Sequence, residues 1–169
     1  MYVTVRPSTG VLQDPAAKPV RVQYVLADPA AQIVGVKIAE DTVEHMAVYR
    51  VDGVLRTSTS ISGWHGDSWT GPRVDWTRHA CTGGQLQVPV HSSSELFAGV
   101  TQRIAVSGDT VPFVVRLPST ATKTIIVHLL PHGGVCHVRF DITPARKPPN
   151  DPRTLGILAA GFEYVPATG

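Results

Sequence analysis

The stretch Lys123–Ile142, KTIIVHLLPHGGVCHVRFDI, indicates how this chain folds. In its second half, apolar and polar side chains alternate, as in a strand that buries one face. The apolar positions there are Cys136, Val138, Phe140 and Ile142. The dipeptide Gly133-Gly134 divides the stretch, and glycine suits a tight hairpin turn because it adopts positive φ at little cost. The stretch therefore predicts a β-hairpin made of Lys123–Leu130 and Val135–Ile142.

The same pattern of strand, turn dipeptide and strand recurs elsewhere in the chain. It predicts three more hairpins, around Asp52-Gly53 (Met46–Val51 and Val54–Ser60), Gly83-Gly84 (Arg73–Cys81 and Gln85–Val90) and Gly108-Asp109 (Gln102–Ser107 and Val111–Leu117). Alternation over Leu158–Tyr164 predicts a final strand. We therefore expect an all-β fold, an antiparallel two-sheet β-sandwich with a jelly-roll-like arrangement and little helix.

Helix signals are confined to two short segments. Ser92–Ala98 is compatible with one turn capped by Ser93, and Ala39–His45 with another. The Pro-rich segment Pro144–Pro152 is expected to run extended across the surface. We expect residues 1–45 to supply N-terminal strands, either as an annex of the same sandwich or as a second small sheet, and residues 46–169 to form the main β-sandwich.

Composition and charge exclude several classes of protein. The formal net charge is only +2, and no run of Lys or Arg occurs, so we expect no nucleic-acid partner. No apolar stretch approaches the ~20 residues that span a bilayer, and the N-terminus lacks the regions of a signal peptide. An extracytoplasmic location would therefore require a larger parent protein that supplies the membrane anchor.

A search for catalytic chemistry finds little. Ser68 lies between glycines in Gly66–Gly71, GDSWTG, but the second glycine comes one residue too late for a nucleophile elbow. The chain contains no phosphate-binding loop and no dinucleotide fingerprint. Four carboxylates are spread over separate predicted strands and loops without an evident pair: Asp67, Asp75, Asp141 and Asp151. We expect the domain itself to be non-catalytic.

Metal binding has no strong candidate in the sequence. A zinc site would need the three clustered histidines, His128, His132 and His137, to converge with a carboxylate or thiolate. Each is more simply an exposed strand or turn residue. A structural calcium ion held by loop carboxylates is compatible with a sandwich, although no residue stands out as its ligand. No cofactor is required by this interpretation, and the metal ligands remain unknown.

All three tryptophans fall within Trp64–Trp76, and two of them lie in the Gly-rich segment Gly63–Gly71. An indole can present its flat face to a sugar ring while neighbouring polar groups bind the hydroxyls. The sequence therefore predicts a carbohydrate site made of Trp64, His65, Asp67, Trp69 and Arg73. The alternative is that both loop tryptophans fold under and close one end of the sandwich. Trp76, in phase with Val74, is expected in the core.

Cys81 and Cys136 are the only cysteines. They are either two buried thiols or one disulfide, and a disulfide implies an oxidising compartment. Cys136 lies on the inward face of its predicted strand, whereas Cys81 is out of phase with Val74 and Trp76. A disulfide therefore needs a local irregularity at Cys81.

Several segments occur together in an order typical of a known family. They are Tyr49–Gly53 (YRVDG), Trp69–Gly71 (WTG), Cys81–Val88 (CTGGQLQV), Glu95–Phe97 (ELF), Thr101-Gln102, Val135–Phe140 (VCHVRF), Asp151–Gly156 (DPRTLG) and Phe162–Tyr164 (FEY). This order resembles the C-terminal extracytoplasmic β-sandwich of actinobacterial membrane glycosyltransferases, which use lipid-linked sugars to build cell-wall glycans. It is similar in role to the carbohydrate-binding C-terminal domains of arabinosyltransferases. The resemblance covers about two-thirds of the chain.

The resemblance implies a non-catalytic accessory domain that binds an arabinan- or mannan-like cell-wall glycan. Its second partner would be the membrane-embedded portion of the parent enzyme, at the extracytoplasmic face of the membrane. In that family the two matched cysteines, Cys81 and Cys136, are expected to pair. Asp151 and Arg153 are expected to form a structural ion pair that holds the Pro-rich segment on the sheet, the alternative being that they bind a ligand. The alternative is a structural or protein-interaction sandwich that docks on its parent enzyme or a partner without binding sugar.

Overall fold

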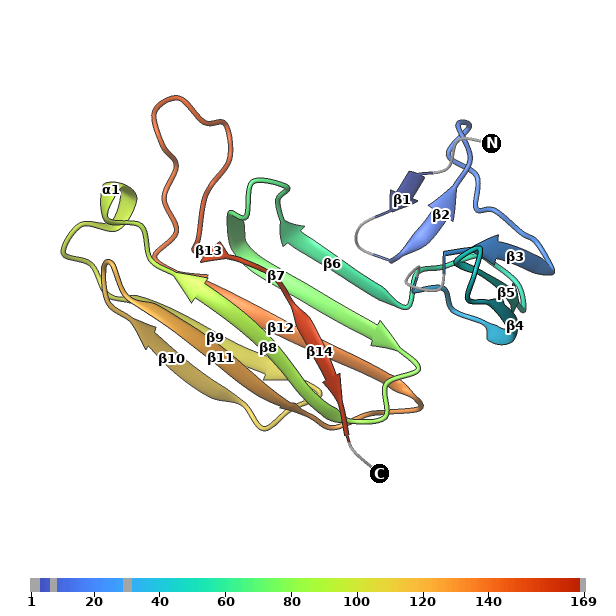
Figure 1. Cartoon of the computed structure of the whole chain (residues 1–169). Helices are drawn as coiled ribbons and strands as arrows, with labels where there is room; N and C mark the ends of the chain where they lie inside the picture. Colours follow the sequence, from blue (N-terminus) through green and yellow to red (C-terminus); the bar gives the residue numbers. More distant parts are fainter. Residues whose placement is uncertain (1–3, 7–8, 29–31, 168–169) are drawn as a thin grey trace. The chain divides into compact units, whose positions relative to one another are not determined.

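The computed structural model of the chain describes residues 4–6, 9–28 and 32–167, and it is all-β (Figure 1). The chain forms two compact units. The N-terminal unit comprises Met1–Ile61 and Arg78–Ala80, and the sandwich unit comprises Ser62–Thr77 and Cys81–Gly169. The expected boundary between residues 45 and 46 thus falls inside the N-terminal unit.

The sandwich unit is built from two antiparallel sheets, as predicted. One sheet has the order β10 (Phe113–Leu117), β9 (Gln102–Gly108), β12 (Val135–Thr143), β7 (Thr70–His79) and β6 (Thr59–Trp64). The other has the order β11 (Thr122–Leu129), β8 (Gly84–His91) and β13 (Leu158–Ala159), and β14 (Glu163–Pro166) also pairs with β8. One short helix is described, α1 (Ser94–Phe97).

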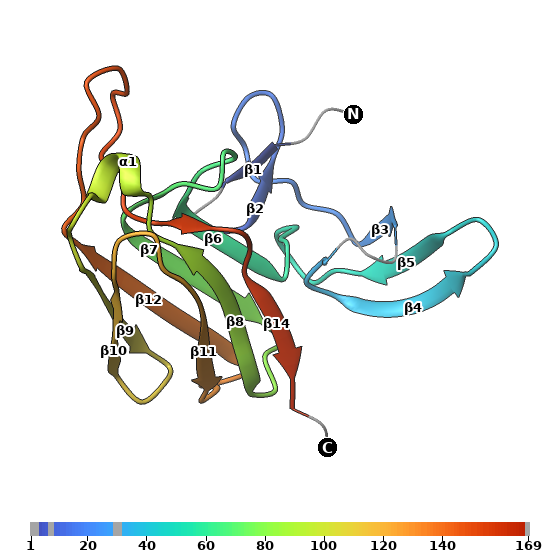
Figure 2. The same cartoon turned by 60° about the vertical axis from the view of Figure 1, so that its left-hand side comes forward.

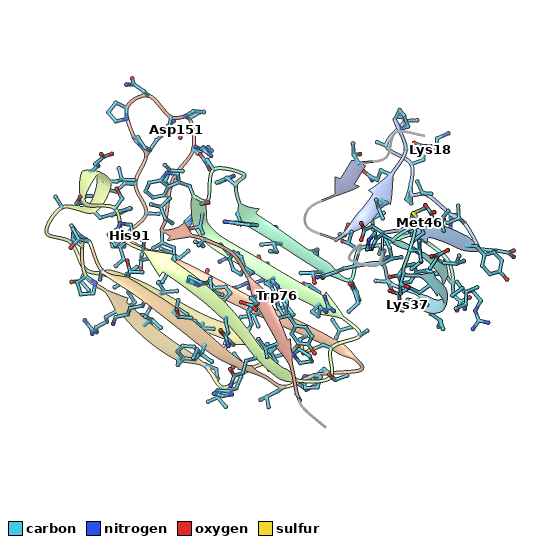
Figure 3. The ribbon with its side chains drawn as sticks, viewed as in Figure 1. Lys18, Lys37, Met46, Trp76, His91 and Asp151 are labelled. Carbon is cyan, nitrogen blue, oxygen red and sulfur yellow. A yellow bond between two sulfur atoms is a disulfide. The ribbon has the colours of Figure 1, made fainter. Side chains whose placement is uncertain are left out.

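The core lies between the inward faces of these sheets, and alternation identified it correctly. The apolar positions of β12 from Cys136 onward are buried, and those on the inward faces of β8 and β11 are buried likewise. Trp76 is 0% exposed, which confirms the prediction that it belongs to the core, and it lies between the sheets in Figure 3. Removing these faces from water supplies the main driving force for folding.

Of the four predicted hairpins, only the one at Gly108-Asp109 is confirmed, with β9 and β10 paired from Val106 opposite Phe113 onward. The glycine pairs at 83–84 and 133–134 instead join strands of different sheets, so the chain crosses from one sheet to the other there. After Asp52-Gly53 no hairpin forms, because the preceding strand pairs with two other strands. Apolar and polar side chains alternate in the same way whether two consecutive strands pair side by side in one sheet or face each other across the core from different sheets. The sequence pattern therefore does not distinguish these two arrangements, which explains the errors.

The structure confirms one of the two predicted helical turns and divides the predicted final strand. The turn over Ser92–Ala98 is confirmed as α1, but Ser93 at its N-cap makes no side-chain capping bond. The second predicted helical turn, Ala39–His45, is wrong, because β4 continues to Asp41 and a turn follows. Asp41 stabilises this turn by accepting hydrogen bonds from the amides of Val43 and Glu44. The predicted final strand is divided into β13 and β14.

The N-terminal unit has its own small core. Its strands are β1 (Thr4–Arg6), β2 (Val11–Gln13), β3 (Tyr24–Ala27), β4 (Val36–Asp41) and β5 (Met46–Arg50). β1 pairs with β2, and β5 lies between β3 and β4. The buried cluster of this unit is Val20, Ala47, Tyr49, Val51 and Leu55.

A disulfide joins Cys81 and Cys136, with their Cα atoms 5.7 Å apart. Of the two states considered for the cysteines, this is therefore the one observed. The expected irregularity at Cys81 is also present, because β7 ends at His79 and Ala80 has φ of 53°. Closing a loop across 55 residues stabilises the fold by about 4 kcal/mol in the chain-entropy description.

Candidate functional site

Three segments meet at one end of the sandwich unit: the β6–β7 loop, α1, and the connection between β12 and β13 (residues 144–157), which contains Pro144–Pro152 and is called the Pro-rich segment from here on. Figures 1 and 2 both place α1 beside the Pro-rich segment, and Figure 3 labels Asp151 in it. These segments enclose a groove of about 380 Å³, called here the Trp69 groove. Its lining residues are Trp69, Ser93, Glu95, Leu96, Pro148, Pro149, Asn150, Asp151 and Leu155.

Trp69 is held by the backbone around it. The amide of His65 donates to the Trp69 carbonyl over 2.8 Å, and the Ser68 amide donates to the His65 carbonyl over 3.0 Å. On the other side, the Ala159 amide donates to the Ser68 carbonyl over 2.9 Å. The half-buried Trp69 side chain is thus presented to the groove from a turn that is fixed to β13.

Trp64 does not line the Trp69 groove. Its side chain is half-buried, and its Nε1 donates to the Ala159 carbonyl over 3.1 Å. Its ring meets Phe162 edge-on with centroids 5.5 Å apart. The two predicted loop tryptophans therefore differ in place: Trp64 packs at the junction of β6 and β13, and Trp69 lines the groove.

Arg153 connects the two loops beside the groove. Its guanidinium donates to both carboxylate oxygens of Asp67, over 3.1 and 2.7 Å. It also donates to Asp151, with the shortest contact 2.6 Å long, so the expected Asp151–Arg153 pair is present and shared with Asp67. Paired donors of this kind hold a carboxylate in one orientation.

These hydrogen bonds favour the ionised carboxylates. Hydrogen bonds from the Arg153 side chain and then its backbone lower the pKa of Asp151 from 3.8 to about 2. The pKa of Asp67 is also lowered, chiefly by the hydrogen bond from Arg153. The two carboxylates in turn raise the pKa of Arg153. Asp151 in the lining of the groove is therefore ionised at neutral pH and hydrogen-bonded to Arg153.

Gln102 holds both ends of the Pro-rich segment. Its side chain is 0% exposed, and its Nε2 donates to the carbonyls of Pro144 and Gly156 over 3.1 and 2.9 Å. Its Oε1 accepts from Ser92 Oγ over 2.9 Å. A buried amide with these partners is costly to lose, so the base of the groove is well defined.

Arg146 ties the Pro-rich segment to α1. Its backbone pairs with Leu155 through two hydrogen bonds of 2.9 and 2.8 Å. Its guanidinium donates to the Leu96 carbonyl over 2.9 Å and lies over the Phe97 ring, 5.7 Å from the centroid. The two walls of the groove are therefore joined by a side chain as well as by their shared base.

The remaining predicted sugar contacts lie outside the groove lining. Arg73 is exposed on β7 and pairs with Asp141 over 2.9 Å. His65 is half-buried in the β6–β7 turn, and its charge makes a minor contribution to the lowered pKa of Asp151. Asp67 does not line the groove, although its carboxylate accepts hydrogen bonds from Arg153 and from the amide of Trp69. Only Trp69, of the five residues predicted for the sugar site, lines the groove.

Sequence reasoning missed the residues that α1 and the Pro-rich segment contribute. They are Ser93, Glu95, Leu96, Pro148, Pro149 and Asn150. The sequence predicted a helical turn over Ser92–Ala98 and an extended run over Pro144–Pro152, and connections at one end of a sandwich are where binding residues collect. No local pattern showed that they meet Trp69, because this depends on the order of strands in two sheets.

Within residues 4–6, 9–28 and 32–167, no group of three or more His, Cys, Asp or Glu side chains is arranged so that it could hold a metal ion. The clustered histidines are separated: His137 pairs with Asp75, and His132 with Asp109. His128 lies on β11 in the opposite sheet. Near the groove, Arg153 already supplies positive charge to Asp67 and Asp151.

Comparisons with protein families, curated proteins and solved structures give no match to this chain. Within the described ranges, no helix is long and apolar enough to cross a membrane. The groove itself offers an indole, prolines and leucines beside hydroxyl, amide and carboxylate groups. This combination suits a polar ring compound that has an apolar face.

Proposed function

We propose that this chain is a non-catalytic carbohydrate-binding domain that holds a neutral glycan in the Trp69 groove. The observation that carries the proposal is the position of Trp69, half-buried in a groove of about 380 Å³ between two loop walls. A sugar ring that lies against the indole places its hydroxyls within reach of polar groups on the walls. Ser93, Glu95 and Asn150 supply these groups.

The structure around the groove supports binding without a large ordering cost. Gln102, Arg146 and Arg153 each connect segments that form the walls or base of the groove. Because these contacts exist before a ligand arrives, little conformational entropy is lost when it binds. A shallow, preformed groove of this size suits one or two sugar residues of a longer chain.

We further propose that the domain serves a membrane glycosyltransferase that builds cell-wall glycan, with arabinan- or mannan-like chains as ligands. The sequence resemblance supports this role, and the disulfide is compatible with an extracytoplasmic location. Attachment to a membrane enzyme raises the local concentration of glycan near its active site, so weak binding to each chain suffices.

The experiment is a titration of the isotope-labelled chain with arabinan and mannan oligosaccharides, followed by NMR and tryptophan fluorescence. We expect shifts at Trp69, Glu95 and Asn150, and an affinity at least about ten-fold lower for Trp69→Ala, because the stacking surface is removed. No shift with any oligosaccharide, or equal affinity for Trp69→Ala, would show that the groove does not bind glycan.

Trp64→Phe is the matched control. Phenylalanine keeps the ring contact with Phe162 but loses the hydrogen bond to the Ala159 carbonyl. We expect Trp64→Phe to lower the free energy of unfolding by about 1 kcal/mol and to leave glycan affinity within about two-fold, as about one hydrogen bond is lost. If Trp64→Phe weakens binding as much as Trp69→Ala does, the glycan site lies at Trp64 instead.

A further inference from the structure

The N-terminal unit contains a hollow of about 410 Å³ that the glycan proposal does not use. It is formed where the start of β4 and the end of β5 meet the segment that follows β5, with the last residue of β7 beside them. Its lining residues are Val34, Gly35, Val36, Arg50, Asp52, Val54, Arg56 and His79. All of these residues belong to the same compact unit.

Positive charge predominates in this hollow. Arg50 and Arg56 contribute two guanidinium groups and Asp52 one carboxylate. Among the described residues, no acidic side chain lies at ion-pair distance from Arg50 or Arg56, although Arg73 and Arg153 of the sandwich unit both have such partners. Two arginines without carboxylate partners therefore line one hollow.

His79 adds a third basic group whose charge depends on its surroundings. Its amide donates to the Ser58 carbonyl over 2.7 Å, which fixes its backbone. Burial, followed by the positive charge of Arg56, lowers the pKa of His79 below 6.5. Only the part of this lowering that comes from Arg56 depends on nearby charge, and a bound anion that offsets that charge would raise the pKa of His79.

We propose that this hollow is an anion-binding site for a phosphate or carboxylate group, held by Arg50 and Arg56 with His79 beside them. The forked donors of a guanidinium match the oxygens of either group. The half-buried side chains of Val34 and Val54 line part of the hollow, and reduced hydration beside them strengthens charge pairing. The negative charge of Asp52 offsets part of the attraction between the two arginines and an anion. Binding therefore depends on direct hydrogen bonds from the guanidinium groups to the ligand.

The test uses the whole chain, with NMR titrations of inorganic phosphate and of glucuronate at constant ionic strength. Sodium chloride at the same ionic strength is the reference. We expect saturable shifts at Arg50, Arg56 and His79 with one or both anions, and none with chloride alone. The anion that binds more tightly distinguishes a phosphate-bearing ligand from a carboxylate-bearing one.

His79 provides an independent readout. An anion beside Arg50 and Arg56 offsets their positive charge, so we expect the pKa of His79 to rise when the anion binds. Asp52 is the remaining charged group that lines the hollow, and Asp52→Asn is expected to tighten anion binding. A pKa of His79 that is identical in phosphate and in chloride counts against the site.

Arg50→Gln and Arg56→Gln are each expected to weaken anion binding at least about ten-fold, because a charge-assisted hydrogen bond is lost. Arg116→Gln, on β10 of the other unit, is the control and should bind as the native chain does. Chemical shifts away from the hollow show whether each variant is folded. Saturable binding that survives Arg50→Gln with Arg56→Gln, or its absence from the native chain, overturns the proposal.

Discussion

Arg153 donates a paired hydrogen bond to the carboxylate of Asp67, a residue 86 positions earlier in the chain. The same guanidinium binds Asp151, so one side chain joins the β6–β7 loop to the Pro-rich segment. Trp69 lies two residues after Asp67 and lines the groove together with Asp151. The geometry of the candidate site thus depends on a contact that neither loop could form alone.

Arg153→Gln is expected to loosen the Trp69 groove more than the fold. Because Arg153 and Asp67 remain open to solvent, with 33% and 47% of their side chains exposed, the free energy of unfolding should change little. Hydrogen exchange of the Ser68 and Trp69 amides should become faster, and glycan affinity should fall several-fold. Arg73→Gln removes the exposed pair with Asp141 and serves as the control. Unchanged exchange in Arg153→Gln would show that backbone contacts alone hold the loop.

Acid should release the same connection. The folded-state pKa of Asp151 is about 2, below its ordinary 3.8, so ionisation favours the folded state. This stabilisation is complete above about pH 5 and is lost progressively as the pH falls through about 2. Carboxyl chemical shifts recorded over an acid titration measure it, and Asp67 should titrate below its ordinary pKa as well. An Asp151 that titrates near 3.8 contradicts the pairing.

Removing the disulfide should cost far more stability. The double variant Cys81→Ser with Cys136→Ser is expected to lose about 4 kcal/mol in the free energy of unfolding, because the 55-residue separation is no longer constrained when the chain unfolds. Urea denaturation with and without reductant measures this loss. The reductant should affect the native chain and leave the double variant unchanged, since the sequence contains no other cysteine.

Gln102→Leu should weaken the base of the groove. The variant leaves Ser92 Oγ and two carbonyls, those of Pro144 and Gly156, without their buried partner. We expect a loss of about 1–3 kcal/mol in the free energy of unfolding. Gln102→Glu should destabilise the fold further, because it places a carboxylate against two carbonyl oxygens. Two variants as stable as the native chain would show that these bonds contribute little.

Gly156→Ala tests how closely the end of the Pro-rich segment approaches β7. A Cβ at residue 156 would lie 2.5 Å from the Gly71 carbonyl oxygen and 2.6 Å from Thr70 Oγ1. The backbone must therefore shift, at a cost of about 1–3 kcal/mol in the free energy of unfolding. Gly161→Ala, which meets nothing within 4 Å, is the matched control for thermal denaturation. Equal melting temperatures for the two variants would contradict this approach.

The sequence was most informative wherever a feature depends on neighbours along the chain. Alternation identified the buried face of Val135–Ile142 and placed Trp76 in the core, because a strand turns successive side chains to opposite faces. The helical turn near Ser94–Phe97 and the irregularity at Cys81 were also visible from local patterns. The glycine dipeptides marked three places where one strand gives way to the next, but only Gly108-Asp109 joins paired strands.

By itself, then, the sequence determined an all-β chain, the inward faces of Gln85–Val90 and Val135–Ile142, and the two cysteines available to pair. The tertiary structure decided which strands pair side by side, which loops meet at Trp69, and that Arg153 binds Asp67 as well as Asp151. The physical reason is the distance along the sequence between the residues that determine each feature. Side-chain alternation and turn conformation are set by adjacent residues, whereas sheet order and the convergence of loops are set by packing between segments far apart in the chain.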